Sequence, residues 1–140
     1  MLLLAGCGTP QQAVPTGSIA VDLGRAVVAV ADRQFGESCV AKPFGTRPAV
    51  VTSAADAQVI YAWTYCWTTV DGVRSTGLQP VVVTVASGTL QTTAEGDYAR
   101  SIERLFPADV RTWAQDPPPL SGLVAEGDAE ASAVPTPAPS

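Results

Sequence analysis

The residues of this sequence with the most chemical potential are three cysteines, Cys7, Cys39 and Cys66, and one lysine, Lys42. The chain contains no histidine, which excludes a Ser-His-Asp catalytic triad. A Ser-Lys nucleophile would depend on Lys42, which has no serine at a motif-like spacing. Without histidine or a closely spaced cysteine pair, the sequence also predicts no metal site and no cofactor.

Carboxylates are the remaining candidates for catalysis, because glycoside hydrolysis needs two of them facing each other across a cleft. The candidates are Asp71, Glu95, Asp97 and Glu103. Three have simpler explanations: Asp71 suits a turn, Asp97 suits a helix cap and Glu103 suits a solvated helix face. We therefore expect no enzyme, with a carboxylate enzyme acting on cell-wall glycan as the alternative. A net charge of −5 argues against nucleic acid as a partner.

The N-terminus carries Leu4, Ala5, Gly6 and Cys7 in succession, followed by a polar stretch at residues 8–12. This run resembles a bacterial lipobox, in which a cysteine thiol receives a diacylglycerol and the residues before it are removed. The resemblance implies that Cys7 anchors the mature protein to the extracytoplasmic face of the cell membrane. Two acyl chains are enough for stable anchoring.

A secretory signal also needs a basic start and an apolar stretch of about 7–15 residues. Only Leu2 to Gly6 provide apolar character before Cys7, and no lysine or arginine precedes them. We therefore hypothesise that Met1 is an internal start and that the precursor extends upstream. The alternative is a cytosolic protein in which the Leu-Ala-Gly-Cys run is accidental, and an in-frame stop directly before Met1 would favour it.

If Cys7 is lipidated, Cys39 and Cys66 form an even pair outside the cytoplasm, where disulfides persist. We predict that they are bonded. Closing this loop would stabilise the fold by roughly 3–4 kcal/mol. The alternative is two unpaired cysteines, with Cys66 filling a core position.

Four aromatic residues alternate with smaller ones between Ala57 and Val70, the period-two pattern of a strand with one heavily apolar face. They are Tyr61, Trp63, Tyr65 and Trp67. Two interpretations are open: a core packed under helices, or a partly exposed surface that binds a partner or a flat ligand. Because few helices are available to cover so much aromatic area, we expect incomplete cover at the Trp67 end.

The elements that would position these residues follow from periodicity and turn signals. Residues 19–35 show polar positions at helical spacing and predict an amphipathic helix, with a buried strand over 26–31 as the alternative. Residues 37–54 contain scattered prolines and glycines and are interpreted as a long connection.

Asp71-Gly72 predicts a hairpin turn, with a return strand to Val85 and a short third strand over Thr89 to Thr93. Gly77 and Pro80 predict an interruption of the return strand, which should be regular only from Val81. A helix over 98–106 follows, and Pro107 opens another. The expected fold class is α+β: a small antiparallel sheet of three to four strands, with the helices packed on one face.

The expected organisation has four parts. Residues 1–7 are the remnant of a lipoprotein signal, 8–17 a flexible tether, 18–116 a single domain and 117–140 a disordered, acidic, Pro/Ala-rich tail. No stretch reaches the roughly 18 apolar residues that span a bilayer, so membrane association is expected through Cys7 alone.

Three runs carry a wider resemblance: the aromatic strand from Val59 to Cys66, the strand from Leu78 to Val83, and residues 95–107. Together they look like a group of small uncharacterised lipoproteins of high-GC Gram-positive bacteria, over about residues 55–114. That group has no established activity, so the resemblance implies an envelope address and an α+β domain only. The expected function is a lipid-anchored module that binds a protein or small ligand at the cell envelope, with a structural accessory lipoprotein as a further alternative.

Overall fold

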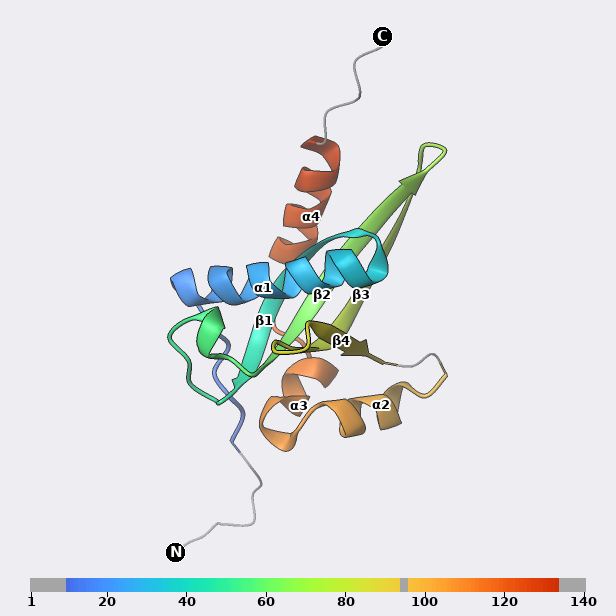
Figure 1. The fold of residues 1–140 in the computed structure, drawn as a ribbon. Coiled ribbons are helices and arrows are strands. Elements are labelled where there is room, and N and C mark those ends of the chain that lie inside the picture. Colours follow the sequence, from blue (N-terminus) through green and yellow to red (C-terminus); the bar gives the residue numbers. More distant parts are fainter. Residues whose placement is uncertain (1–9, 94–95, 134–140) are drawn as a thin grey trace, which may run out of the picture.

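The computed structural model describes residues 10–93 and 96–133 as a four-stranded antiparallel sheet with helices on both faces (Figure 1). Each strand pairs with its sequence neighbour, so β1 and β4 form the two edges. The strands are β1 (Ser38–Arg47), β2 (Val59–Val70), β3 (Val73–Thr84) and β4 (Thr89–Thr92). The predicted α+β class and antiparallel sheet are confirmed. The predicted lipidation site, Cys7, lies outside the described residues.

The helices cover both faces of the sheet, so the expectation that they pack on one face was wrong. On one face lies α1 (Gly17–Phe35), and on the other lie α2 (Tyr98–Leu105), α3 (Ala108–Gln115) and α4 (Ser121–Ala133). A short 3₁₀ turn, η1 (Ala54–Asp56), precedes β2. Helices lie on both faces of the sheet because β2 is apolar on both sides, and both sides must be buried.

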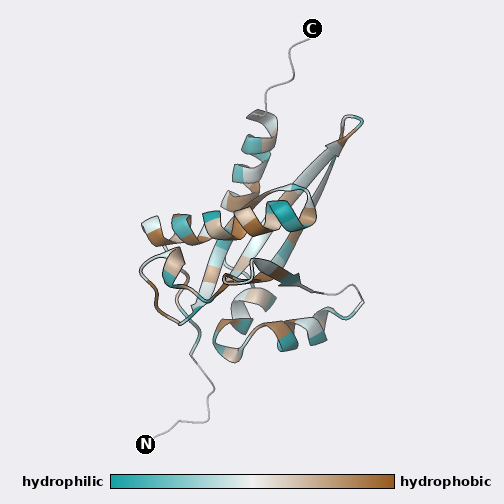
Figure 2. Ribbon diagram, viewed as in Figure 1, coloured by the Kyte–Doolittle hydropathy of each residue, from teal (hydrophilic) through white to brown (hydrophobic). Residues whose placement is uncertain are grey.

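The core therefore has two layers. Ile60, Ala62 and Cys66 of β2 face α1, where they pack with Leu23 and Val27. The odd-numbered aromatic residues of β2 face α2, α3 and α4. The predicted first helix is confirmed, with apolar and polar residues interspersed along it (Figure 2) and an end at Gly36, whose φ is 67°.

Strand β1 lies where the sequence predicted a long connection, so that prediction was wrong. Pro43 and Gly45 look like strand breakers, but an edge strand tolerates proline where its missing N–H would face away from the neighbour. The register shifts between Pro43 and Gly45, which marks a bulge at Phe44. A side chain on Gly45 would collide with Val110 of α3, so glycine permits this close approach.

The predicted hairpin at Asp71-Gly72 is confirmed, with φ angles of 52° and 78° that suit a type I′ turn. Strand β3 continues without a break through Gly77 and Pro80, where the sequence predicted an interruption. Strand β4 and the two helices on either side of Pro107 also match the predictions. Asp97 occupies the N-cap position of α2, but its side chain makes no capping hydrogen bond there.

Both ends of the packed region extend beyond the predicted domain of residues 18–116. The tail from residue 117 was predicted to be disordered, yet Ser121–Ala133 forms α4. At the other end, the Gln12 backbone amide donates to the Asp109 carbonyl at 2.7 Å, so this part of the predicted tether is held against α3. No helix among the described residues is long and apolar enough to cross a membrane.

Candidate functional site

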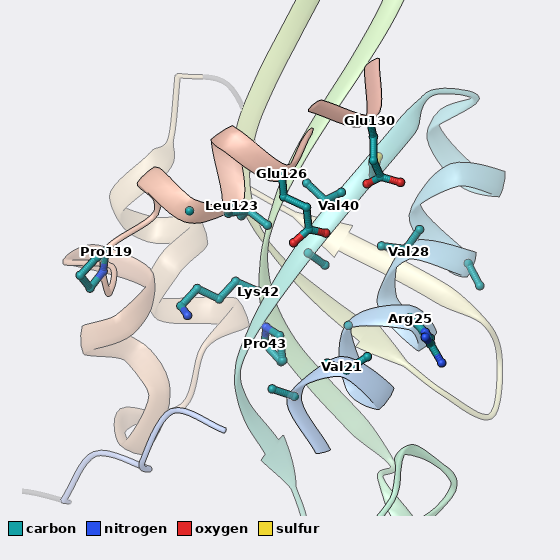
Figure 3. A pocket seen from close by; sticks show the side chains of 16 residues that line it. Val21, Arg25, Val28, Val40, Lys42, Pro43, Pro119, Leu123, Glu126 and Glu130 are labelled. Atoms are coloured by element: carbon teal, nitrogen blue, oxygen red, sulfur yellow. The ribbon is translucent and has the colours of Figure 1, made fainter. Parts of the chain in front are cut away.

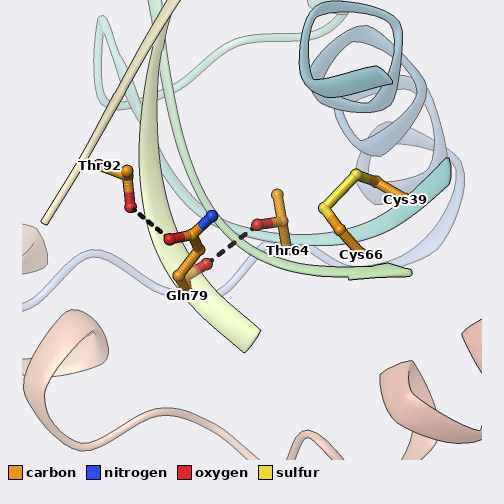
Figure 4. Close-up of a disulfide and its surroundings, with 5 residues drawn as sticks. All are labelled: Cys39, Thr64, Cys66, Gln79 and Thr92. Carbon is orange, nitrogen blue, oxygen red and sulfur yellow. Dashed lines mark hydrogen bonds between the residues drawn. A yellow bond between two sulfur atoms is a disulfide. The ribbon is translucent and has the colours of Figure 1, made fainter. Parts of the chain in front are cut away.

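The predicted disulfide is present and joins Cys39 to Cys66 directly across β1 and β2 (Figure 4). Both residues are buried beneath α1. The neighbouring Thr64 is also buried, and its hydroxyl donates to the Gln79 carbonyl at 3.1 Å. The disulfide therefore fixes the edge strand β1 to β2 in the centre of the sheet.

The four aromatic residues of the predicted binding surface are all buried, with 4–8% of their surface exposed. Tyr61 packs against Phe106 of α2's C-terminal end at a centroid distance of 5.9 Å. The indole N–H of Trp63 donates to the Trp113 carbonyl at 2.8 Å. Of the two interpretations, the one as core applies, and the expected incomplete cover at the Trp67 end is wrong.

The helix α4 supplies the cover that the sequence did not predict at the Tyr65 and Trp67 end of β2. Gly127 lies so close to both rings that a side chain there would collide with Tyr65. The Tyr65 hydroxyl donates to Asp128 at 2.8 Å, which holds α4 in place. This hydrogen bond is the main cause that raises the pKa of Tyr65, since ionisation would place two negative charges side by side.

The candidate catalytic carboxylates are not brought together. Asp71 lies in the β2–β3 turn, and Asp97 precedes α2 at the other end of the molecule (Figure 1). Glu103 is exposed on α2, and Glu95 lies outside the described residues. Within the described residues, no three histidine, cysteine, aspartate or glutamate side chains gather as metal ligands.

A charged network does form where β1 meets α3. Arg47 binds Asp109 in a bidentate ion pair, with contacts of 2.6 and 3.0 Å. The Gln12 side-chain amide donates to the same carboxylate at 2.6 Å, and the guanidinium lies 5.5 Å from the Tyr61 ring centroid. The hydrogen bond from Arg47 lowers the pKa of Asp109 below its ordinary value. Because these groups satisfy one another, the network fastens the N-terminal segment to the sheet.

An open groove of about 810 Å³ runs along β1 between α1 and α4 (Figure 3). We call it the edge groove. Helices on opposite faces of a sheet can line one groove only at the sheet's edge, and β1 is an edge strand. Its residues include Ala20, Val21, Gly24, Arg25, Val28, Val40, Lys42, Pro43, Leu123, Glu126 and Glu130.

The edge groove has two chemically different walls. The α1 wall presents small apolar groups at Ala20, Gly24 and Val28, one helical turn apart. The α4 wall presents Glu126 and Glu130, which form no ion pair with any described residue. Arg25 and Lys42 also line the groove without an ion-pair partner in the described part of the chain. These charges are therefore free to meet a ligand.

Sequence reasoning did not find the edge groove. Lys42 was considered only as a nucleophile, and Glu126 and Glu130 were assigned to a disordered tail. The one sequence signal was the spacing of Ala20, Gly24 and Val28, small residues on one face of a predicted helix.

Comparison of the chain with protein-family models, with sequences of characterised proteins and with solved structures gives no match.

Proposed function

We propose that this protein is a lipid-anchored extracytoplasmic module that binds a protein or small ligand at the cell envelope through the edge groove. The observation that carries the binding role is the groove itself. Its volume of about 810 Å³ falls within the range of ligand sites, roughly 300–1,000 Å³. An apolar wall combined with a few charged groups is a common composition of such sites.

The envelope address is supported by the N-terminal sequence and by the disulfide. The Leu4 to Cys7 run resembles a lipobox and would place a diacylglycerol on Cys7. The Cys39–Cys66 bond is typical of proteins from oxidising compartments. The resemblance to small lipoproteins of high-GC Gram-positive bacteria points to the same address.

The arrangement of the groove carboxylates favours binding over catalysis. Glycoside hydrolysis needs two carboxylates on either side of the scissile bond. Glu126 and Glu130 lie one turn apart on the same helix, so they occupy one wall of the groove. The proposed role is therefore non-catalytic.

Site-specific photo-crosslinking in intact cells tests the binding role. A photoreactive amino acid replaces Val28, which lines the edge groove, and in a matched variant it replaces Val50, which is 85% exposed and outside it. We expect a discrete crosslinked product from the Val28 variant that the Val50 variant lacks. Crosslinks of equal yield and pattern from both positions, or none from Val28, would contradict a ligand site in this groove.

A further inference from the structure

Strand β1 has backbone groups that face the edge groove. The Cα atoms of Cys39 and Cys66 are 4.0 Å apart, which is closer to the spacing of a non-hydrogen-bonded pair in an antiparallel ladder, about 4.5 Å, than to that of a hydrogen-bonded pair, about 5.5 Å. The N–H and C=O of Cys39 therefore point away from β2. Because this property alternates along a strand, the same holds for Ala41 and for the carbonyl of Pro43.

Two contacts agree with this orientation. Burial raises the pKa of the Asp32 carboxyl in α1, and the Cys39 backbone amide opposes this rise, which agrees with an amide that faces outward from the sheet. The Ala41 carbonyl oxygen would lie 3.3 Å from a Cβ built on Gly24, also in α1. Outside the strand ladder, the Ala41 amide has no hydrogen bond to any described residue. One amide and three carbonyls thus point outward from this edge and have no hydrogen-bond partner in the described part of the chain.

The two walls restrict what can pair with these groups. The edge groove is lined by α1 on one side of the sheet and by α4 on the other (Figure 3). We expect a single extended chain to enter between these walls more readily than the edge of another folded sheet, which carries its own covering layers. An added strand also directs alternate side chains to opposite faces, so its side chains would meet the two walls in turn.

We propose that the edge groove binds an extended peptide as an antiparallel fifth strand on β1, with apolar side chains toward α1 and basic side chains toward α4. The proposal rests on the proposed function, because it names the ligand class of the same groove. Strand addition of this kind takes affinity from backbone pairing and specificity from alternate side chains. The peptide residue that pairs with Ala41 directs its side chain to the same face of the sheet as Ala41, which is the α1 face. It is therefore one of the apolar residues.

Charge and spacing select the basic residues. Glu126 and Glu130 are separated by four helical residues, a rise of about 6 Å. Side chains on one face of a strand repeat every two residues, at about 6.6–6.8 Å. Two basic residues with one apolar residue between them therefore match the two carboxylates. Lys42, beside Pro43 in Figure 3, disfavours a further basic residue at that end of the groove.

The test uses a defined probe, the peptide acetyl-Thr-Val-Lys-Val-Lys-Val-Thr-amide, and the folded, disulfide-bonded protein. Binding is followed by NMR titration and by hydrogen exchange of the Ala41 amide. At saturation we expect exchange of this amide to slow at least roughly 10-fold, since a buried hydrogen bond protects it. N-methylation of the central valine should weaken binding at least roughly 10-fold, because it removes a paired backbone N–H.

Charge variants complete the experiment. Glu126→Gln and Glu130→Gln should each weaken binding of this probe roughly 2- to 5-fold, the range of exposed ion pairs, while Glu103→Gln on α2 should not. A probe with glutamates in place of the lysines should bind more weakly than the lysine probe. Absence of binding, equal binding of the N-methylated probe, or unchanged exchange at Ala41 would overturn the strand-addition proposal. If the photoreactive residue in place of Val28 still crosslinks a ligand in cells, the proposed binding function of the edge groove would stand without strand addition.

Discussion

Asp109 is the residue at which electrostatics and folding are most closely linked. Its carboxylate accepts hydrogen bonds from Arg47 and Gln12, and these bonds lower its pKa. Because the pKa is lower in the folded than in the unfolded chain, the ionised carboxylate stabilises the fold above about pH 4. This contribution is lost as the pH falls through the folded-state pKa.

We predict that Asp109→Asn lowers the free energy of unfolding by about 1–2 kcal/mol at pH 7, a value reduced for the partial exposure of the pair. The difference from the wild type should shrink at a pH below the lowered folded-state pKa of Asp109, where both forms are neutral. Urea denaturation at the two pH values measures it, with Glu103→Gln on the exposed face of α2 as control. A difference of equal size at both pH values would contradict the ionic origin.

The disulfide is the second residue-scale contribution to stability. It closes a loop between residues 27 positions apart, so its removal should lower the free energy of unfolding by about 3–4 kcal/mol in the chain-entropy model. The double variant Cys39→Ala/Cys66→Ala, compared with the oxidised wild type by urea denaturation, measures this. Thiol counting on the native, unreduced protein should find neither cysteine titratable, and two free thiols would contradict the bond.

At the scale of elements, α4 depends on a glycine at its point of contact with the sheet. Gly127 lies against the rings of Tyr65 and Trp67, while Gly122 in the same helix has no neighbour within 4 Å of an added Cβ. We predict that Gly127→Ala destabilises the protein by about 1–3 kcal/mol through overpacking. Gly122→Ala should be neutral or stabilising by up to about 1 kcal/mol, because it only improves helix propensity.

Thermal denaturation and acrylamide quenching of tryptophan fluorescence distinguish these two variants. In Gly127→Ala the displaced helix should expose Trp67, so quenching should increase relative to the wild type. In Gly122→Ala quenching should stay at the wild-type level. Equal behaviour of the two variants would show that α4 does not dock through Gly127.

The elements that the sequence predicted well are those with strong local signals. The polar spacing of α1, the alternation along β2 and the Asp71-Gly72 turn each define a structure within a few residues. Strand β1 could not be predicted in this way, because Pro43 and Gly45 disrupt the local pattern. Only pairing with β2 makes that segment a strand, and the pairing is a tertiary interaction.

The helix α4 escaped prediction for a different reason. Its sequence is rich in alanine, glycine and acidic residues and lacks a broad apolar stripe. Its attachment depends on single contacts instead: Leu123 is buried, Gly127 meets two rings, and Asp128 accepts from Tyr65 and from Arg74 at 3.0 Å. Because the edge groove needs both α4 and β1, the candidate site was beyond sequence reasoning.

At the scale of the whole molecule, the edge groove and the proposed anchor are linked through the N-terminal segment. Gln12 is bound to Thr46 and Asp109, so the chain leaves toward Cys7 from the end of the sheet opposite the β2–β3 turn (Figure 1).

Labelling with palmitate tests most directly whether Cys7 carries a lipid anchor. The anchor matters because the location of the protein determines which ligands the edge groove can meet. The gene is expressed from its native locus in cells fed labelled palmitate, as the wild type and as Cys7→Ala. We predict that the wild-type protein carries label and fractionates with membranes, and that Cys7→Ala carries none. An unlabelled wild-type protein in the cytosolic fraction would contradict it.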